Sequence, residues 1–526
     1  MTAAPVTVAE VTGSGLAAAR RELVAAMLAA PAGTVSPSVY ETGRLVSDAP
    51  WLPGHDERVR HLLVTQRPDG GWGAPGAYGL VPTLSAVEAL LSSLAAPGRS
   101  APLRAYRLSP AVDRGVAALR DRLLVAAGPV PDMPGVDLIV PALIDRIDTL
   151  LAVTAPLSGW RVPPLPMPQG MTRHRAEAVG RLLAAGRPVP EKLWHAFEVL
   201  DERARAHPRA RLVSGAVGAS PAATAAWLGD PARGGADRVA LGWLTGVVAR
   251  GGGPVPCTTP ITVFERAWVL SSLARVGAAA DVPAALTAGL ADALGPTGAA
   301  TSPGLPTDAD TTAATLFALA RLGRPVAPDS LSAYDTGAHF CTWQGEDGAS
   351  VTTNAHVLEA LGWHARHGPG RPYADVARRV AGWLVDAQRA DGSWTDRWHA
   401  SPYYATASAT AGLAEYGPGT AGARLDRAVD WVRDTQREDG SWGLWTGTPE
   451  ETAYALQVLL GTGRPPGPGL AGVVRRAMAY LDGHPDPADD GVPLWHDKDL
   501  YHPVLIVRAA LLAARHLVRL SGHAGP

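Results

Sequence analysis

The chain has 526 residues, of which 47% are hydrophobic and 18% charged, and its formal net charge at pH 7 is -2. These values exclude a disordered chain, argue against a nucleic-acid-binding surface, and leave room for two or three domains. The two cysteines, Cys257 and Cys341, are too few for a disulfide framework or a Cys-rich metal site. We therefore expect a reducing compartment, by default the cytoplasm.

The N-terminal residues contain no basic stretch leading into an apolar core, so we expect no signal peptide. We find no run of about 18 apolar residues, and we expect neither a transmembrane helix nor stable membrane insertion. Residues 14–30 are rich in alanine and predict an amphipathic helix, with Ser14 as a possible N-cap and Pro31 and Gly33 at its end.

A seven-residue pattern, Q-x-x-D-G-x-W, occurs three times, beginning at Gln66, Gln388 and Gln436. A recurring pattern indicates stacked supersecondary units, and the 48-residue spacing of the last two copies suits a helical hairpin with its loops. Asp-Gly favours a turn, Gln can bond free backbone groups, and Trp can cover the junction. The pattern predicts structure and by itself carries no chemistry.

From about residue 100 to residue 260, apolar helical segments alternate with joints rich in Pro and Gly. Sustained alternation of apolar and polar residues is missing, so we predict an all-α protein with almost no strand. The Gly- and Pro-marked break at residues 251–256 is a candidate domain boundary.

Two acids, Asp308 and Asp310, stand one residue apart before a long apolar run that ends at Gly323 and Pro325. One interpretation is ordinary helix capping by an Asp. The other is that two carboxyls this close do not both ionise easily, so that one keeps a proton at neutral pH. The local sequence leaves both interpretations open.

Together, the repeats and the acid motif resemble the class II terpene cyclase family, over about residues 60–510. Further stretches are similar to its bacterial, diphosphate-using branch: residues 78–84, 353–358, 398–406 and 499–508. The family motif is D-x-D-D, and here Thr311 replaces the last Asp. The D-x-D-T-T variant is most similar to drimenyl diphosphate synthases, which cyclise farnesyl diphosphate.

This resemblance implies two α/α barrels, called β and γ. Residues 1–40 would contribute a helix to the β domain, residues 41–264 would form the inserted γ domain, and residues 265–526 would complete the β domain with the acid motif.

The resemblance also implies roles for individual residues. Asp310 would be the general acid, Asp308 would raise the pKa of Asp310, and Thr311 would be an uncharged hydrogen-bonding neighbour. Asn354 would orient the acid, with N-capping as the alternative. The remaining candidates would line the cavity, and core packing is the alternative for the aromatic ones: His356, Trp343, Trp398, Tyr403, Tyr404 and Tyr501.

Lys498 and Arg508 are the candidates for binding a diphosphate together with Mg²⁺, whose ligands the sequence does not identify. The chain has only two lysines, Lys192 and Lys498. In a chain so rich in Arg, a retained Lys points to a need for an ammonium group, and we favour Lys498. Because acidic residues flank Lys498, an ion pair at the surface is the alternative.

The predicted function is cyclisation of farnesyl diphosphate to drimenyl diphosphate, started by protonation of an alkene. The class I motif D-D-x-x-D is absent from the sequence, so the diphosphate would be retained. The first alternative is a diterpene cyclase that makes a copalyl-type diphosphate from geranylgeranyl diphosphate. A squalene-hopene-type cyclase, a helical protein-binding module and a glycoside hydrolase are three further candidate functions. The oligomeric state is not predicted.

Overall fold

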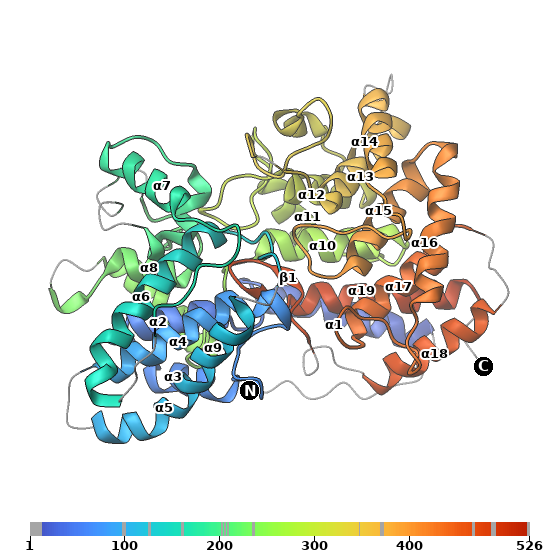
Figure 1. Cartoon of the computed structure of the whole chain (residues 1–526). Helices are drawn as coiled ribbons and strands as arrows, with labels where there is room; N and C mark the ends of the chain where they lie inside the picture. Colours follow the sequence, from blue (N-terminus) through green and yellow to red (C-terminus); the bar gives the residue numbers. More distant parts are fainter. Residues whose placement is uncertain are drawn as a thin grey trace.

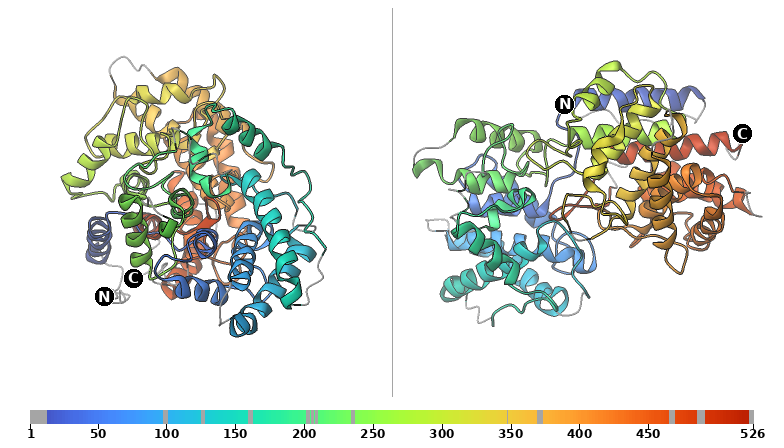
Figure 2. Two further views of the ribbon diagram at one scale, coloured as in Figure 1. Left: turned by 90° about the vertical axis from the view of Figure 1, so that its left-hand side faces the viewer. Right: turned by 90° about the horizontal axis from the view of Figure 1, so that it is seen from above.

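The computed structural model describes residues 13–96, 101–124, 128–158, 163–200, 204, 207, 210–233, 237–346, 348–368, 373–464, 469–484 and 491–522. These residues form two helical bodies that lie side by side (Figures 1 and 2). We call them the larger and the smaller barrel. Both are α/α barrels, in which an inner ring of helices is surrounded by outer helices. This confirms the predicted all-α fold with two α/α barrels.

The larger barrel has a closed inner ring, because each of its helices packs against the next and the last packs against the first. The ring consists of α10 (Thr262–Arg275), α12 (Ala309–Arg321), α13 (Val351–His367), α15 (Pro402–Tyr416), α17 (Pro449–Gly461) and α19 (Val504–Leu520). Outside it lie α1 (Gly13–Ala29), α11 (Ala284–Asp292), α14 (Ala374–Asp386), α16 (Gly422–Asp434) and α18 (Leu470–Gly483).

Hydrophobic patterning explains which helices are inside. Inner helix α12 is buried without interruption from Ala309 to Ala320. Outer helix α14 buries only Ala377, Val380, Ala381 and Leu384, at the i, i+3, i+4, i+7 spacing of one helix face. A helix of the inner ring contacts neighbours on all sides, so it is apolar all round. An outer helix contacts neighbours on one side only, so its apolar residues lie on one face.

The smaller barrel has an inner ring of α2, α4, α6, η3 and α8, which also closes on itself. Their bounds are α2 Val39–Asp48, α4 Leu80–Ala95, α6 Val136–Ser158, η3 Glu191–Val199 and α8 Pro221–Leu228. The outer helices are α3 (His55–Val64), α5 (Ala101–Ala118), α7 (His174–Ala184) and α9 (Arg238–Gly251). The remaining short elements are η1 (Gly76–Gly79), η2 (Leu119–Leu123), η5 (Pro231–Arg233), η6 (Pro328–Tyr334), η7 (Gly419–Ala421) and an antiparallel hairpin of β1 (Trp495–His496) and β2 (Leu500–Tyr501).

The N-terminal helix lies with the C-terminal part of the chain. Helix α1 packs against α19 (Figure 1), and Leu23 and Met27 share one hydrophobic core with residues 261–518. A separate core begins at Tyr40 and is drawn from residues 40–165, joined by Leu500 of the hairpin. The division of the chain after residues 40 and 264 stays a prediction. The two cores support a break near residue 40, whereas α10 already begins at Thr262 and Ile261 belongs to the core of the larger barrel.

One helix, Gly76–Ala95, is long and apolar enough to cross a membrane by length and composition, contrary to the expectation that no segment of this kind occurs. In the protein, 72% of its apolar window is buried. It contains α4, which packs against α2, α5 and α6. A helix enclosed by other helices is apolar on all sides, and burial in the smaller barrel accounts for its hydropathy.

The three repeats adopt the same structure. Each Trp is fully buried, and its indole N–H donates to a backbone carbonyl at 2.6 to 2.8 Å; the residues are Trp72, Trp394 and Trp442. Each Gln donates to the carbonyl of its own repeat glycine and to a carbonyl in or beside the next outer helix, at 2.8 to 3.0 Å. The repeats therefore join successive outer helices, and the Gln and Trp side chains bond backbone groups at these junctions.

Gly440→Ala is expected to lower the free energy of unfolding by about 3 kcal/mol. Gly440 has φ +90°, and a Cβ there would lie 2.5 Å from the carbonyl oxygen of Arg476, so backbone strain and a backbone clash add. Gly463→Ala is the matched control, because Gly463 has φ +65° with open space around it, and we expect a loss of only about 1 kcal/mol. Urea unfolding measures both, and equal losses would contradict the repeat geometry.

Candidate active site

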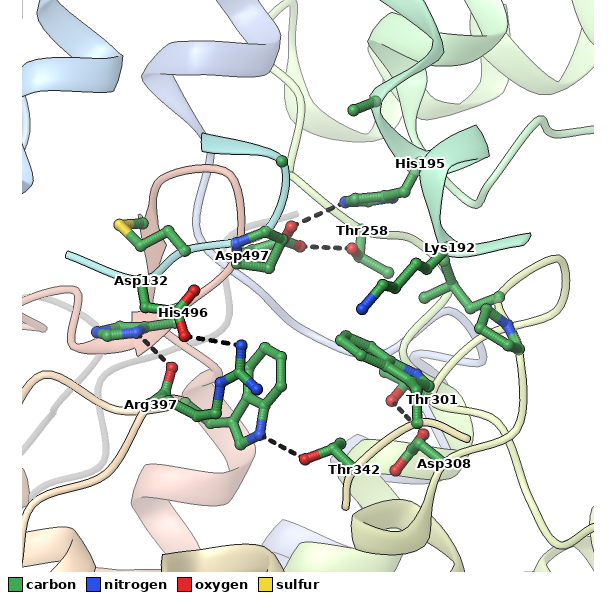
Figure 3. A pocket seen from close by; sticks show the side chains of 18 of the residues that line it. Asp132, Lys192, His195, Thr258, Thr301, Asp308, Thr342, Arg397, His496 and Asp497 are labelled. Carbon is green, nitrogen blue, oxygen red and sulfur yellow. Dashed lines mark hydrogen bonds and ion pairs between the residues drawn. The ribbon is translucent and has the colours of Figure 1, made fainter. Parts of the chain in front are cut away.

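A cavity of about 490 Å³ lies between the two barrels (Figure 3). One wall comes from the smaller barrel and consists of residues 132–138, Arg175, Ala178, Val179, Leu182, Pro190, Lys192, Leu193, His195 and Ala196. The other walls come from the larger barrel and the hairpin, and include the start of α12, the aromatic residues of α10, and the residues just before α15. The cavity holds both acids of the predicted motif, and aromatic rings and charged side chains gather around it.

Asp308 is the N-cap of α12, so the first interpretation of the acid motif holds for this residue. Its Oδ1 accepts the backbone N–H of Thr311 at 2.6 Å, and its Oδ2 accepts the Thr301 hydroxyl at 3.3 Å. The Thr301 and Thr311 hydroxyls are also hydrogen-bonded, at 2.9 Å. Burial and the nearby Asp310 carboxyl outweigh these bonds and raise the pKa of Asp308 to about 7. The second interpretation, a proton held near neutral pH, is therefore also supported.

This pKa predicts that Asp308 makes the protein less stable as pH rises from about 4 to about 7. In that window the folded protein holds a proton that the unfolded chain, with the ordinary pKa of 3.8, has lost, so unfolding is favoured with increasing pH. The loss should be on the order of 4 kcal/mol across the window. We expect Asp308→Asn to reduce the pH dependence of stability by this amount in urea unfolding curves at pH 4.5 and 7.5, while Glu41 and Glu265, whose pKa values are also raised to about 7, keep their own contributions. An unchanged slope would contradict the assignment.

Asp310 lies in the first turn of α12 and is 8% exposed. Its Oδ1 is 2.6 Å from Nδ1 of His356, a residue of α13. The His356 ring stands edge-on to Trp268, with centroids 5.2 Å apart. His356 was predicted to line the cavity but is not among the lining residues; instead it connects the predicted acid to the aromatic wall.

The orienting role predicted for Asn354 is wrong. The Asn354 side chain accepts the N–H of Phe340 and donates to the carbonyls of Phe340 and Ser350, at 2.8 to 2.9 Å. It does not cap α13 either, because Ser350 does. Asn354 therefore holds the loop before α13, while His356, two residues further along, contacts the acid.

Four of the predicted aromatic residues line the cavity: Trp343, Trp398, Tyr404 and Tyr501. Tyr403 does not, because its ring packs on Trp431 at a centroid distance of 4.7 Å. Sequence reasoning missed three further lining residues, Phe264, Trp268 and Trp495. The spacing of Phe264 and Trp268, four residues apart on one face of a buried helix, could have identified them. Trp495 could have been identified because it stands four residues before the matched stretch 499–508.

Trp268, Phe264, Tyr404 and Trp495 form a continuous aromatic wall. Ring centroids lie 4.4 Å apart for Phe264 and Trp268, 5.6 Å for Phe264 and Trp495, and 4.7 Å for Tyr404 and Trp495. The indole N–H of Trp268 donates to the Tyr404 hydroxyl at 2.7 Å. Because His356 touches Trp268, the aromatic wall begins beside Asp310.

A basic cluster at the cavity surrounds Glu346. Arg397 bonds Glu346 at 3.1 Å and Asp132 at 2.7 Å, and its guanidinium lies 5.1 Å from the ring centroid of Trp398. The ammonium of Lys192 is 3.7 Å from Glu346 and 5.0 Å from the ring centroid of Trp343. In Figure 3, Arg397 lies apart from Asp308 and Thr301. Neither Lys192 nor Arg397 was among the predicted site residues.

The diphosphate-binding role predicted for Lys498 needs correction. Lys498 is fully buried and is not among the residues that line the cavity; it forms an ion pair with Glu41 and hydrogen bonds at 2.9 Å to Glu198 and Ser220. Its ion pairs form a buried cluster, whereas the alternative interpretation placed an ion pair at the surface. Arg508 is half-buried in α19 and is likewise not among the lining residues. The rarity of lysine did carry a signal, but Lys192 is the lysine at the cavity.

A second ion pair beside Lys498 joins the barrels and faces the cavity. Nε2 of His195, from the smaller barrel, is 2.8 Å from Asp497 Oδ1 in the hairpin turn, and Thr258 donates to Asp497 Oδ2 (Figure 3). Nδ1 of His195 faces the carbonyl of Gly218 at 2.6 Å, so both ring nitrogens meet acceptors. Burial opposes the charge, but Asp497 outweighs it and raises the pKa of His195. The imidazolium form fits this site.

Comparison with known proteins assigns the family. The family model described as "Squalene-hopene cyclase C-terminal domain" matches residues 339–465. An ent-copalyl diphosphate synthase from Streptomyces sp. (strain KO-3988) is 46% identical over 500 residues, covering 95% of both chains. A labda-7,13-dienyl diphosphate synthase from Streptomyces clavuligerus is 42% identical over 515 residues, covering 94% of this chain and 92% of that protein.

The structure of ent-copalyl diphosphate synthase from Streptomyces platensis is similar with a TM-score of 0.87 and 46% identity, covering 95% of this chain and 99% of that chain. These relatives are named for copalyl and labdadienyl diphosphates, which overturns the prediction of a drimenyl diphosphate synthase. That prediction depended on Thr311 alone, whereas the similarity extends along nearly the whole chain. The chain belongs to the class II terpene cyclase family.

Proposed function

We propose that the protein is a diterpene cyclase that converts geranylgeranyl diphosphate to a bicyclic, copalyl-type diphosphate and retains the diphosphate. The observation that carries this proposal is the order of groups in one cavity, with an acid pair, an aromatic wall and a basic cluster. The names of the relatives favour a copalyl-type product.

Asp310 donates the proton that starts the reaction. His356 holds Oδ1 of Asp310, which leaves Oδ2 to protonate the terminal alkene. The alkene electron pair forms the new C–H bond, and the cation is then attacked by the next two alkenes, which closes two rings. Loss of one proton from the bicyclic cation restores an alkene. The aromatic wall stabilises the cations through its ring faces and excludes water that would quench them.

The basic cluster binds the diphosphate. Lys192 and Arg397 supply positive charge at the cavity, and Arg397 presents a planar fork that suits phosphate oxygens. Both are held in place by Glu346 and stacked on Trp343 and Trp398.

Mg²⁺ is the proposed cofactor, and Glu346 and Asp132 beside the basic cluster are its candidate ligands. The Oε2 atom of Glu346 is buried without a hydrogen-bond partner in the described part of the chain, and Asp132 stands on the other side of Arg397. Among the described residues no group of three or more His, Cys, Asp or Glu side chains forms a metal site. Glu346 and Asp132 would therefore hold the ion jointly with the diphosphate, whose charge it would neutralise.

Lys192→Gln is expected to raise KM for the prenyl diphosphate at least tenfold, with kcat within about threefold, because it removes a charge from the diphosphate end and not from the acid. Arg181→Gln is the control, since Arg181 lies on the exposed face of α7 and pairs with Glu177. Steady-state kinetics with dephosphorylated product measured by mass spectrometry tests both. Equal effects of the two substitutions would contradict the placement.

The function itself is tested by incubating the purified protein with Mg²⁺ and either geranylgeranyl or farnesyl diphosphate. After dephosphorylation, the products are identified by gas chromatography and mass spectrometry. We expect a bicyclic C20 alcohol of the copalol type. Turnover of neither substrate, or a product that has lost its diphosphate before the phosphatase step, would refute the proposal.

A further inference from the structure

One carboxylate behind the aromatic wall has no part in the chemistry described so far. Glu450 stands in the first turn of α17, is 3% exposed, and is not among the residues that line the cavity. Its Oε1 accepts the indole N–H of Trp495 at 2.8 Å. Trp495 does line the cavity, so Glu450 is one hydrogen bond away from the reacting space.

The surroundings of Glu450 supply donors but no balancing cation. His399 Nε2 lies 3.3 Å and the Tyr454 hydroxyl 3.4 Å from the same Oε1 atom. The backbone N–H of Ser401 donates to Nδ1 of His399, which leaves Nε2 as the nitrogen that can donate to Glu450. Within the described residues no Lys or Arg forms an ion pair with Glu450. Three hydrogen-bond donors therefore point at one oxygen of Glu450.

The second oxygen of Glu450 is less well satisfied. Oε2 is buried and has no hydrogen-bond partner among the residues that the structure describes, and Nδ1 of His502 is 3.8 Å away. Among the described residues, the basic groups beside Glu450 are thus two histidines, and a carboxylate buried without a Lys or Arg partner is unfavourable for folding. The next residue, Glu451, is also buried, but both of its carboxylate oxygens accept hydrogen bonds, from Ser401, Thr448 and the backbone N–H of Leu444. Glu451 therefore stabilises the start of α17 and the loop before it.

We propose that Glu450 is a buried counter-charge for the cationic intermediates and acts on them through Trp495 as a positioning residue. The inference rests on the proposed function. The hydrogen bond from the indole N–H to a carboxylate fixes the indole plane and makes the ring more electron-rich, which strengthens the attraction between the ring face and a cation. In a cavity of low polarity, the negative charge itself also acts over several ångströms.

The position suits this role. Trp495 contacts Phe264 and Tyr404, and Tyr404 is bonded to Trp268, which touches the His356 beside the acid. Glu450 bonds Trp495 directly, whereas Asp310 is connected to the same wall through His356 and Trp268. Glu450→Gln would keep the hydrogen-bond acceptor for Trp495 and remove the negative charge. The substitution therefore tests the charge without altering the packing of Trp495.

The test compares two ligands that share one prenyl diphosphate skeleton. One carries a tertiary ammonium at the position of the first cation, and the other carries a neutral carbon there. Isothermal titration calorimetry gives the ratio of their affinities without turnover. We expect Glu450→Gln to weaken the ammonium ligand about tenfold and to leave the neutral ligand within about twofold.

Turnover supplies a second readout. We expect Glu450→Gln to lower kcat about tenfold to a hundredfold with KM within about threefold, and to shift product toward monocyclic compounds released early. Glu451→Gln is the matched control, and it should lower thermal stability while leaving the affinity ratio and the product mixture unchanged. The proposal is overturned if Glu450→Gln weakens both ligands equally or neither.

Should Glu450→Gln not fold, Trp495→Phe provides the same comparison, because it keeps a ring face and removes the N–H that reaches Glu450. The affinity ratio should then fall at least threefold, and an unchanged ratio overturns the proposal. If the wild-type protein binds both ligands but does not cyclise geranylgeranyl diphosphate, the proposed function fails while the affinity ratio still decides on the counter-charge.

Discussion

Asp310→Asn is expected to lower kcat about ten-thousand-fold, at the upper end of what a general acid contributes. The substitution preserves shape and burial, and removes only the proton that the alkene must receive. Circular dichroism and urea unfolding should show an unchanged fold, so the loss is chemical. Residual activity above about 1% would move the acid to Asp308, whose pKa of about 7 also allows it to hold a proton.

Two neighbouring substitutions on α13 make this test sharper. His356→Ala should lower kcat about a hundredfold, because Asp310 loses the partner at its Oδ1. Asn354→Ala should instead lower the free energy of unfolding by about 2 kcal/mol, because it leaves the backbone groups of Phe340 unpaired. The kcat of the folded Asn354→Ala protein should change less than fivefold. The reverse pattern would restore the original assignment of Asn354.

The second large effect is on stability. Lys498→Met is expected to lower the free energy of unfolding by about 3 to 5 kcal/mol, because it leaves the carboxylates of Glu41 and Glu198 buried without their cation. Burial raises the pKa of Glu41 to about 7 even with Lys498 present, so this carboxyl is already poorly accommodated. Urea unfolding at pH 7 measures the loss.

Lys192→Met is the matched control, since Lys192 is 39% exposed in its side chain and should change stability by less than about 1 kcal/mol. Adding Glu41→Gln to Lys498→Met should recover part of the loss, because one uncompensated charge is removed. If Lys498→Met is as stable as the wild type and instead raises KM, Lys498 faces the diphosphate and the ion cluster described above is wrong.

The parts of the fold that were predictable depend on residues close together in sequence. Each Q-x-x-D-G-x-W copy folds on itself, with the Asp carboxylate accepting an N–H two residues away, so the pattern carries its own structure. The Asp308 cap needs only Thr311. The spacing of apolar residues likewise distinguishes an inner helix from an outer one. Inner helix α12 is apolar along its whole length, whereas outer helix α14 has apolar residues on one face only.

The failures concern partners far apart in the chain. His356 reaches Asp310 across 46 residues, and Lys498 reaches Glu198 across 300. Near position 498 the sequence displays only Asp497 and Asp499, so it suggests an exposed ion pair, whereas the hairpin turn inserts Lys498 into the smaller barrel.

By itself, the sequence determined the helical class, the stacked repeats and the two acids at a helix start, since these depend on local spacing and on one helix cap. The tertiary structure decided which histidine holds the acid, which aromatic rings face the cavity, and which lysine lies at the cavity. The physical reason is that a side chain's role depends on the charges and rings that packing brings within a few ångströms, and packing here joins residues from both barrels. Thr311 is a further example. This one side chain near the acid does not determine the length of the cavity, which depends on walls contributed by both barrels.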